Sequence, residues 1–283
     1  MSEPHPVDAS DLAPVHKDKL KVADEIAVQI IDMNKWYGQF HVLRDVNLTV
    51  HRGERIVIAG PSGSGKSTLI RCINRLEEHQ SGRIVVDGTE LTNDLKNIDK
   101  VRSEVGMVFQ HFNLFPHKSV VDNVALGPRK LKGLSKDEAR EVALRQLEIV
   151  GLTNKADVRP ARLSGGQQQR VAIARALAAE TPLFLLDEPF AALDALTRER
   201  LQEDVRQVSA ESGRTTVFVT HSAEEAAFLG SRIVVLTRRP GQVALDIPVN
   251  LPRTGIDPDD LRRSPEYAEL RTEVGKAVKA AAA

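Results

Sequence analysis

Short apolar runs recur along the first part of the chain, and their length and content of β-branched residues predict strands. These runs lie at Ala27 to Met33, Val42 to Val50, Arg55 to Ala59, Arg83 to Val86 and Val105 to Phe109. Ordered structure is therefore expected to begin near Ala27. Residues 1–25 are rich in Pro, Asp, Lys and Ser and have little periodicity, so we expect a flexible N-terminal extension there.

The pattern changes to helical periodicity between about Ser119 and Ala179. The segment from Lys136 to Val150 has apolar residues at the spacing of one helical face, namely Ala139, Val142, Ala143, Leu147 and Val150. We therefore expect a helical insert in this part of the chain, with a helical subdomain over about residues 111–179.

Strands and helices alternate again after the insert. Strands are predicted at Leu183 to Leu186, Thr216 to Thr220 and Ile233 to Thr237, with a helix from Leu196 to Ser209 between the first two. This alternation is typical of a parallel sheet in an α/β fold. The segment RRPGQV from Arg238 onward is read as a last strand-like piece, and an amphipathic helix from Pro265 to Lys279 ends a C-terminal segment of residues 241–283.

Composition narrows the classes of partner. The 283 residues carry 39 basic and 39 acidic side chains, and a net charge of zero argues against nucleic acid as the main partner. The single cysteine, Cys72, cannot form an intramolecular disulfide, so a reducing compartment is expected and the side chain is predicted to be a small buried apolar group. No apolar run is long enough for a signal peptide or a membrane span, so we expect a cytoplasmic chain.

A phosphate-binding loop is the strongest local motif. The sequence GPSGSGKST fits G-x-x-x-x-G-K-[ST], follows the apolar run RIVIA and leads into the helical run TLIRCINRLEE. Glycines allow successive N–H groups to approach phosphate oxygens, the lysine adds charge, and the serine hydroxyl can ligate Mg²⁺. The predicted ATP-binding residues of the loop are Gly60, Pro61, Ser62, Gly63, Ser64, Gly65, Lys66, Ser67 and Thr68.

Two acidic residues follow the apolar run Leu183 to Leu186. Asp187 is predicted to hold Mg²⁺ together with Ser67, and Glu188 is predicted to be the general base that polarises the attacking water. Acidic pairs after strands are commonly solvated loop residues, and the phosphate loop is what makes the catalytic interpretation the better one.

A second predicted anion site selects among the classes of phosphate-loop protein. The sequence LSGGQ comprises Leu163, Ser164, Gly165, Gly166 and Gln167 and stands at the start of the helical run QQQRVAIARALAA. Two phosphate-binding surfaces on one chain are economically explained by a head-to-tail homodimer or pseudo-dimer, in which Ser164 of one subunit closes over the γ-phosphate held by Lys66 of the other.

With these motifs, the chain resembles the ATP-binding cassette (ABC) family over about residues 26–240. The resemblance implies an α/β fold with a RecA-like P-loop NTPase core, an antiparallel β subdomain and the helical insert, and it implies ATP and Mg²⁺ as ligands. It also implies roles for four more residues: Tyr37 would stack on adenine, Gln110 would sense Mg²⁺ and the water, Asp194 would cross the dimer interface, and His221 would contact the γ-phosphate.

The subfamily resemblance divides along the chain. Residues from about Val28 to His117 resemble the ATPases of polar amino-acid importers, whereas PFAALDALTRERLQ and LTRRPGQVALDIPVNLPR, within about residues 185–252, resemble those of nitrate, sulfonate and taurine importers. Ala191 and Ser222 also depart from the residues most common in the family, and neither departure removes a catalytic group. Uptake of polar amino acids is the first hypothesis, and uptake of nitrate, sulfonate or taurine is the alternative.

An importer ATPase implies transmembrane permease subunits, indirectly a solute-binding protein, no nucleic acid, and a peripheral place at the cytoplasmic face of the inner membrane. In the family the permease docks beside the helical insert, and Phe112, Leu114 and Phe115 are either its apolar docking patch or part of the core. A competing class is an ABC ATPase that moves no solute, but the single cassette and short insert disfavour it. A small-molecule kinase would not explain LSGGQ.

Overall fold

A computed structural model describes residues 25–191, 193–252 and 254–283, so nearly all of the predicted N-terminal extension lies outside the described residues. The strands are β1 (Ile26–Tyr37), β2 (Phe40–His51), β3 (Arg55–Ala59), β4 (Ser81–Val86), β5 (Thr89–Glu90), β6 (Val105–Val108), β7 (Leu183–Asp187), β8 (Thr215–Val219), β9 (Arg232–Leu236) and β10 (Val243–Pro248). The α-helices are α1 (Lys66–Ile73), α2 (Leu95–Ser103), α3 (Val120–Leu131), α4 (Lys136–Ile149), α5 (Gly165–Ala178), α6 (Ala195–Ser212), α7 (Ala223–Leu229), α8 (Pro258–Arg263) and α9 (Pro265–Ala280). Two 3₁₀ turns, η2 (Thr153–Lys155) and η3 (Pro160–Arg162), lie between α4 and α5.

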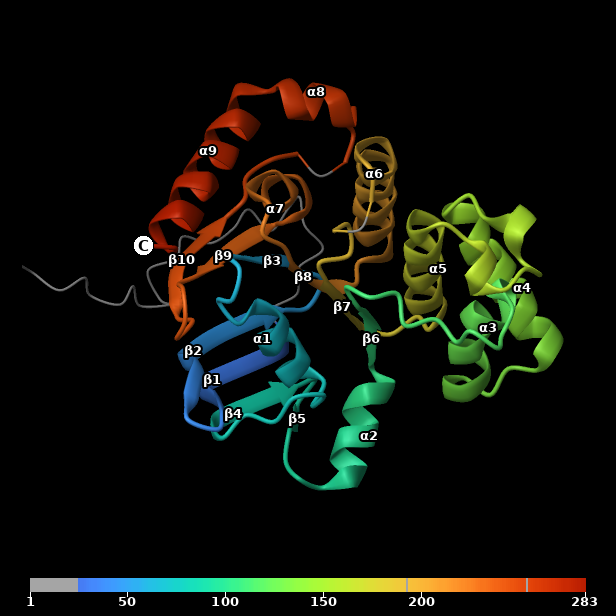
Figure 1. Ribbon diagram of the computed structural model, residues 1–283, viewed down its shortest axis with the longest axis horizontal. Coiled ribbons are helices and arrows are strands. Elements are labelled where there is room, and N and C mark those ends of the chain that lie inside the picture. The colour runs from blue at the N-terminus through green and yellow to red at the C-terminus, as the bar shows by residue number, and fades with distance from the viewer. Residues whose placement is uncertain (1–24, 192, 253) are drawn as a thin grey trace, which may run out of the picture.

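Two sheets form the centre of the molecule (Figure 1). One is antiparallel, with the order β2-β1-β4-β5, and the other has six strands in the order β10-β9-β3-β8-β7-β6. The strands from β9 to β6 are parallel, and β10 joins the edge antiparallel to β9. The α/β fold with a P-loop NTPase core and an antiparallel β subdomain is therefore confirmed.

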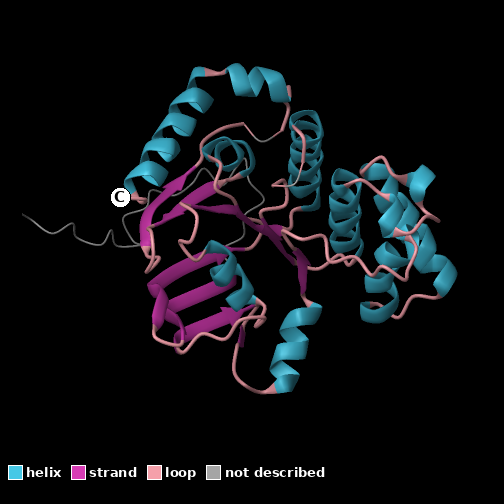
Figure 2. Cartoon of the chain, in the orientation of Figure 1, coloured by secondary structure: helices cyan, strands magenta, loops and turns pink. Residues whose placement is uncertain are grey.

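The strands of the parallel sheet are buried on both faces, as their continuous apolar runs require. Alternate residues of β3 serve two cores: Val57 and Ala59 belong to one cluster, and Ile56 and Ile58 to the other. The first core lies under α5, α6, α7 and α9, while the second lies between the parallel sheet, the antiparallel sheet and α1. Figure 2 shows this layering of helices around the two sheets.

The helical layer beside the sheet has a core of its own. Helices α3, α4 and α5 pack together at one end of the molecule (Figure 1). Ala139, Ala143 and Leu147 of α4 are fully buried, and Val150 just after it is nearly so, as the helical periodicity predicted. Ser135 begins α4 with a capping box in which its hydroxyl accepts from the backbone N–H of Glu138 and the Glu138 carboxylate accepts from the backbone N–H of Ser135.

The C-terminal segment is packed onto the core. Strand β10 pairs with β9, and α9 covers α7. Tyr267 of α9 is 1% exposed, and its hydroxyl donates to the carbonyl oxygen of Glu224 at 3.1 Å. Within the described residues, no helix combines the length and apolar character that crossing a membrane requires.

Most predicted boundaries lie within one or two residues of the observed ones, but β1 extends to Tyr37, four residues past its predicted end, and α6 extends to Ser212, three residues past its predicted end. Other predictions differ in more than a boundary. The helix after the phosphate loop ends at Ile73, several residues before the predicted run stops. The strand read at RRPGQV begins only at Val243, because Pro240 and Gly241 occupy the turn before it. Helix α2 was not predicted, since only Ile98 and Val101 of its nine residues are buried.

Candidate nucleotide site

The carboxyl ends of four neighbouring parallel strands place the predicted site residues at one edge of the sheet. The order β3-β8-β7-β6 brings together the loops after those strands. Gly60 follows β3, His221 follows β8 by two residues, Asp187 ends β7, and Gln110 follows β6 by two residues. Open α/β sheets bind ligands at this edge.

The phosphate loop has a backbone that needs glycine. Gly60 has φ 152° and Gly65 has φ 92°. A Cβ at Gly60 would lie 2.7 Å from the carbonyl oxygen of Leu236, and one at Gly65 would lie 2.7 Å from Cδ2 of Leu43, so neither position has room for a side chain. The turn brings backbone N–H groups to the start of α1, which is the geometry of an anion cradle.

Lys66 lies inside this cradle. Its ammonium donates to the carbonyl oxygens of Gly60 at 3.0 Å and Pro61 at 2.9 Å, and the residue is 5% exposed. Burial lowers the pKa of Lys66, while the charges of Glu188 and Asp187 oppose that change. The hydroxyl of Ser64 is buried in the loop without a hydrogen-bond partner, so one polar group of the loop is left unsatisfied.

Ser67 and Asp187 meet where an oxygen-binding cation would be expected. The Ser67 hydroxyl donates to Oδ1 of Asp187 at 2.6 Å, and the guanidinium of Arg71 donates to Oδ2 at 2.9 Å. Asp187 is fully buried, so its carboxylate depends on these two partners. A hydroxyl and a carboxylate are ligands that Mg²⁺ accepts, and the pair therefore fits this ion.

Glu188 and His221 face one another across the next loop. Nδ1 of His221 lies 3.4 Å from Oε2 of Glu188, and the imidazole is mostly exposed. The backbone of Glu188 has φ 46°, in the left-handed region that costs a non-glycine residue roughly 1–2 kcal/mol. Its N–H donates to the carbonyl oxygen of Val219, which holds this turn at the end of β7. Such strain is common at functional sites.

A cavity of about 70 Å³ opens beside this pair, and Glu188, His221, Arg198 and Glu225 line it. Glu225 accepts from the Thr220 hydroxyl at 2.5 Å. Burial raises the pKa of Glu225. The cavity can hold water next to the predicted general base.

Asp194 and Ser164 both begin helices. The Asp194 carboxylate accepts from the backbone N–H of Thr197 at 3.0 Å and caps α6, an interaction that lowers the pKa of Asp194. The Ser164 hydroxyl accepts from the backbone N–H of Gln167, and Oε1 of Gln167 accepts from the backbone N–H of Ser164. Ser164 is exposed, as an anion-binding helix start must be.

The LSGGQ segment and the phosphate loop of one chain are separate. Leu163 is buried in the core of the helical layer, while Gly165 and Gly166 open α5. Within the described part of the chain, no hydrogen bond joins this segment to the phosphate loop, and α5 and α1 lie in different layers (Figure 1).

Tyr37 ends β1 and is 43% exposed. The Lys35 ammonium lies over its ring, 4.2 Å from the centroid. Burial of the hydroxyl, and next a hydrogen bond with Glu77, raise the pKa of Tyr37. The ring therefore has exposed surface left on which a base could stack.

Three residues of this region were not predicted from the sequence. Arg71 binds Asp187, Lys35 lies against Tyr37, and Glu225 lines the cavity beside Glu188 and His221. Arg71 could have been found, because it stands four residues after Ser67 and so shares a helical face with it.

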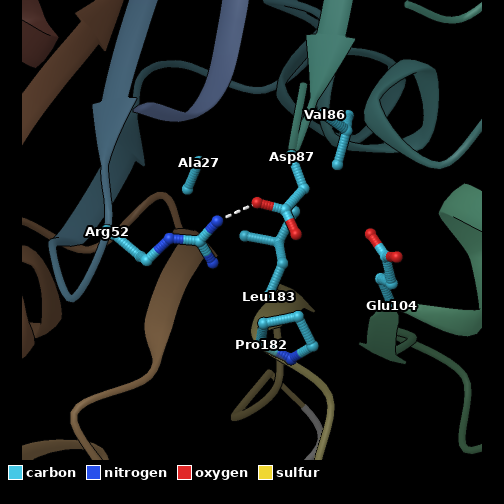
Figure 3. A pocket seen from close by; sticks show the side chains of 7 residues that line it. All are labelled: Ala27, Arg52, Val86, Asp87, Glu104, Pro182 and Leu183. Atoms are coloured by element: carbon cyan, nitrogen blue, oxygen red, sulfur yellow. Dashed lines mark hydrogen bonds and ion pairs between the residues drawn. The ribbon is translucent and has the colours of Figure 1, made fainter. Parts of the chain in front are cut away.

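A smaller pocket lies at the opposite edge of the parallel sheet (Figure 3). Glu104 and Leu183 line it where β6 and β7 begin, and Arg52 and Asp87 form an ion pair at its rim. Its volume of about 10 Å³ has room for roughly one water, which could satisfy the unpartnered Oε2 of Glu104. This pocket is therefore a packing feature and not a nucleotide site.

The fold and this edge of the sheet define an ABC-type ATP hydrolase. Residues 43–191 match the family described as ABC transporter, and the chain belongs to that family. The chain is 57% identical to the glutamate/glutamine/aspartate/asparagine transport ATP-binding protein BztD of Rhodobacter capsulatus, over 83% of this chain and 88% of the relative. It is also 57% identical to the general L-amino acid transport ATP-binding protein AapP of Rhizobium johnstonii, over 78% of this chain and 85% of the relative.

Solved structures agree with the family. The dimeric post-hydrolysis structure of the ATP-binding cassette MJ0796 with ADP and Pi has a TM-score of 0.72 and 37% identity, over 81% of this chain and all of that one. The structure of cbiO1 from Clostridium perfringens, described as part of the ABC transporter complex cbiONQ, has a TM-score of 0.72 and 28% identity, over 91% of this chain and 99% of that one. The alignment with BztD covers 83% of the chain, so it extends well beyond residue 185. Residues after 185, which were expected to resemble nitrate, sulfonate and taurine importers, therefore also align with a relative named for amino-acid transport.

Proposed function

We propose that this chain is the ATP-hydrolysing subunit of an importer of polar amino acids, peripheral to the cytoplasmic face of the inner membrane. The observation that carries the proposal is 57% identity, over most of both chains, to two relatives named for amino-acid transport. Its partners are a second ATPase subunit, transmembrane permease subunits and, indirectly, a solute-binding protein.

Each chain contacts one ATP through two parts of its own surface. Tyr37 stacks on the adenine, and the cradle from Gly60 to Thr68 holds the phosphates. The Lys66 ammonium turns from the backbone carbonyls of the cradle to the phosphate oxygens. Ser67 and Asp187 hold Mg²⁺, with Gln110 nearby on the neighbouring loop, and the ion when bound neutralises charge on the phosphate oxygens.

Glu188 is the general base of the reaction. Its carboxylate accepts the proton of the water that attacks the γ-phosphate, and the water lies in the cavity between Glu188 and His221. His221 donates toward the γ-phosphate and, 3.4 Å from the base, also fixes the orientation of the Glu188 carboxylate.

The site is completed by a second copy of the chain. The helix start at Ser164 points an exposed hydroxyl and backbone N–H groups outward, and the phosphate loop of the same chain does not meet them. A head-to-tail dimer joins the two surfaces around the nucleotide, with Asp194 at the interface. The MJ0796 cassette with the same fold is described as dimeric in its ADP and Pi state.

Replacing Glu188 with Gln tests base and dimer together. The variant is expected to bind ATP and, with Mg²⁺, to form a dimer of two 31.1 kDa chains, while phosphate release falls about 100-fold or more. Light scattering after gel filtration and a phosphate-release assay measure the two effects. Lys66→Ala serves as the control that should stay monomeric. Normal turnover in Glu188→Gln would contradict the base assignment, and a monomer at saturating Mg²⁺-ATP would contradict the dimer.

The permease docks on a patch of Phe112, Leu114 and Phe115. Leu114 packs against two of the cores, so it supports the patch from below. Phe115 is 39% exposed, and the Arg175 guanidinium lies 6.0 Å from its ring centroid. The exposed ring and the half-buried Phe112 offer apolar area to a cytoplasmic helix of the permease.

Uptake measurements test the choice of solute. A strain lacking this subunit is complemented with the intact chain or with Glu188→Gln, and uptake of labelled glutamate, glutamine, taurine and nitrate is compared. Restored uptake of the amino acids by the intact chain alone is expected. Restored uptake of taurine or nitrate instead would favour the second subfamily, which residues 185–252 resemble.

A further inference from the structure

Lys35 is a buried cation that the nucleotide site does not otherwise use. It is 4% exposed, and strand alternation puts it on the same face of β1 as Tyr37. Its ammonium lies 4.2 Å from the centroid of the Tyr37 ring. Because Lys35 covers one face of that ring and the tyrosine is still 43% exposed, the exposed surface lies on the other face and the ring edge.

The same ammonium binds the segment that follows the phosphate-loop helix. It donates to the carbonyl oxygen of Glu78 at 2.7 Å and lies 3.4 Å from Oε2 of Glu77, five and four residues, respectively, after α1 ends at Ile73. Helix α1 starts with Lys66 and Ser67 in the phosphate cradle, so Lys35 connects the segment after that helix to Tyr37.

Tyr37 has further neighbours in the same region. Glu77, the partner of Lys35, and Thr68 in the first turn of α1 both shift the pKa of the Tyr37 hydroxyl, Glu77 upward and Thr68 downward. The ring therefore has a cation on one face and polar groups of α1 and of the segment after it near its hydroxyl. A cation on one face of an aromatic ring attracts π-electron density toward itself, which leaves the opposite face a better partner for an electron-rich base.

We propose that Lys35 is a positioning residue for base recognition, which holds the Tyr37 ring in place from one face so that its open face can stack on a purine. The inference rests on the base-stacking role given to Tyr37 in the proposed function. Lys35 is 4% exposed and its ammonium lies over the ring, so its effect on a base acts through Tyr37.

Comparing ATP with inorganic tripolyphosphate separates this role from general support of the fold. For Lys35→Met, the Kd for Mg²⁺-ATP is expected to rise about 3- to 10-fold, and the Kd for tripolyphosphate is expected to stay the same. Lys35→Arg, which keeps a cation near the ring, should recover part of the loss. Arg83→Met, which removes an exposed cation from β4 in the same sheet, is the matched control and should change neither Kd.

A double variant identifies the route of the effect. Lys35→Met combined with Tyr37→Ala should bind ATP no more weakly than Tyr37→Ala alone, because the cation acts through the ring. Lys35→Gln, which can still donate to a backbone carbonyl, provides a second neutral variant if the methionine variant folds poorly by circular dichroism.

Three results would overturn the inference. Equal losses for ATP and tripolyphosphate in Lys35→Met would show a structural role only. Unchanged ATP affinity in both neutral Lys35 variants, with Tyr37→Ala still weakened, would remove Lys35 and keep the base-stacking role. Unchanged ATP affinity in Tyr37→Ala would remove the base-stacking role from the proposed function, and the inference with it.

Discussion

Individual residues at the carboxyl edge of the sheet owe their properties to partners far away in the sequence. Asp187 is fully buried, and Ser67 and Arg71, more than a hundred residues earlier, donate to its two oxygens. Glu188 keeps a left-handed backbone through a bond to Val219 on the neighbouring strand. The chemistry of each residue therefore depends on strand order as much as on the local motif.

Cys72 provides a pH test at this scale. Burial raises the pKa of its thiol from 9.0 to about 12, so the folded chain keeps a proton that the unfolded chain releases above pH 9. Stability should therefore fall as pH rises from about 9 toward 12, by about 1 kcal/mol between pH 8 and pH 10. Urea unfolding at both pH values measures this change.

The matched variant Cys72→Ala isolates the thiol from the lysines and tyrosines that titrate in the same range. Its stability should fall less than that of the natural chain over the same interval. An equal fall in both proteins would contradict the assigned pKa. The natural thiol should also react with a disulfide reagent only when the chain unfolds.

The residues of the phosphate loop could be predicted because their motif is local and its geometry demands glycine. Lys35 and Glu225 could not be predicted in this way, since each is an ordinary residue type whose role comes from a contact made only after folding. Lys35 meets a partner 43 positions away, and its single position carries no signal of that contact. Arg71 shares a helical face with Ser67 and could have been found by that spacing, although its partner Asp187 lies 116 positions away.

At the scale of elements, the strength of the apolar pattern separates the strands and helices that were predicted from those that were missed. Strands with continuous apolar runs, such as β3 and β7, were predicted because both of their faces are buried. Helix α2 has charged residues on most of its surface and buries only two side chains, so its pattern is too weak to detect. Its start is marked by Asp94, whose carboxylate accepts from the backbone N–H of Lys96.

Two helices with the same capping box allow a controlled test of the second anion site. Ser164 begins α5 and Ser135 begins α4, each with its hydroxyl accepting from the residue three positions later. Alanine at either position should lower the free energy of unfolding by about 1 kcal/mol. Only Ser164→Ala should also lower the rate of ATP hydrolysis, because only that helix start is proposed to face the nucleotide of a partner.

Urea unfolding and a phosphate-release assay on the two variants measure these effects. Equal ATPase rates in Ser164→Ala and Ser135→Ala would mean that the serine of LSGGQ is a helix cap and nothing more. A loss of activity in both variants would instead point to general destabilisation of the helical layer.

At the scale of the whole molecule, the C-terminal segment is part of the packed body. Arg262 of α8 binds Glu203 of α6 at 2.7 Å, and its guanidinium lies 4.2 Å from the centroid of the Phe228 ring in α7. Tyr267 of α9 completes the same core.

Tyr267 measures the contribution of α9 to stability. Tyr267→Ala removes a fully buried ring and should lower the free energy of unfolding by about 3–5 kcal/mol. Tyr267→Phe loses only the hydrogen bond to Glu224 and should cost about 1 kcal/mol. Thermal unfolding of both variants tests this order, and a change below 1 kcal/mol in Tyr267→Ala would show that α9 is not integral to the core.

The alternation of buried side chains in the parallel sheet restricts how the chain can change in length. Adding or removing one residue within β3 or β7 would exchange the side chains that serve the two cores, and every larger group would meet the wrong neighbours. Insertions can be accommodated in the connecting segments, where side chains do not alternate between two cores. Variation in length among relatives should therefore be confined to the connections between the strands.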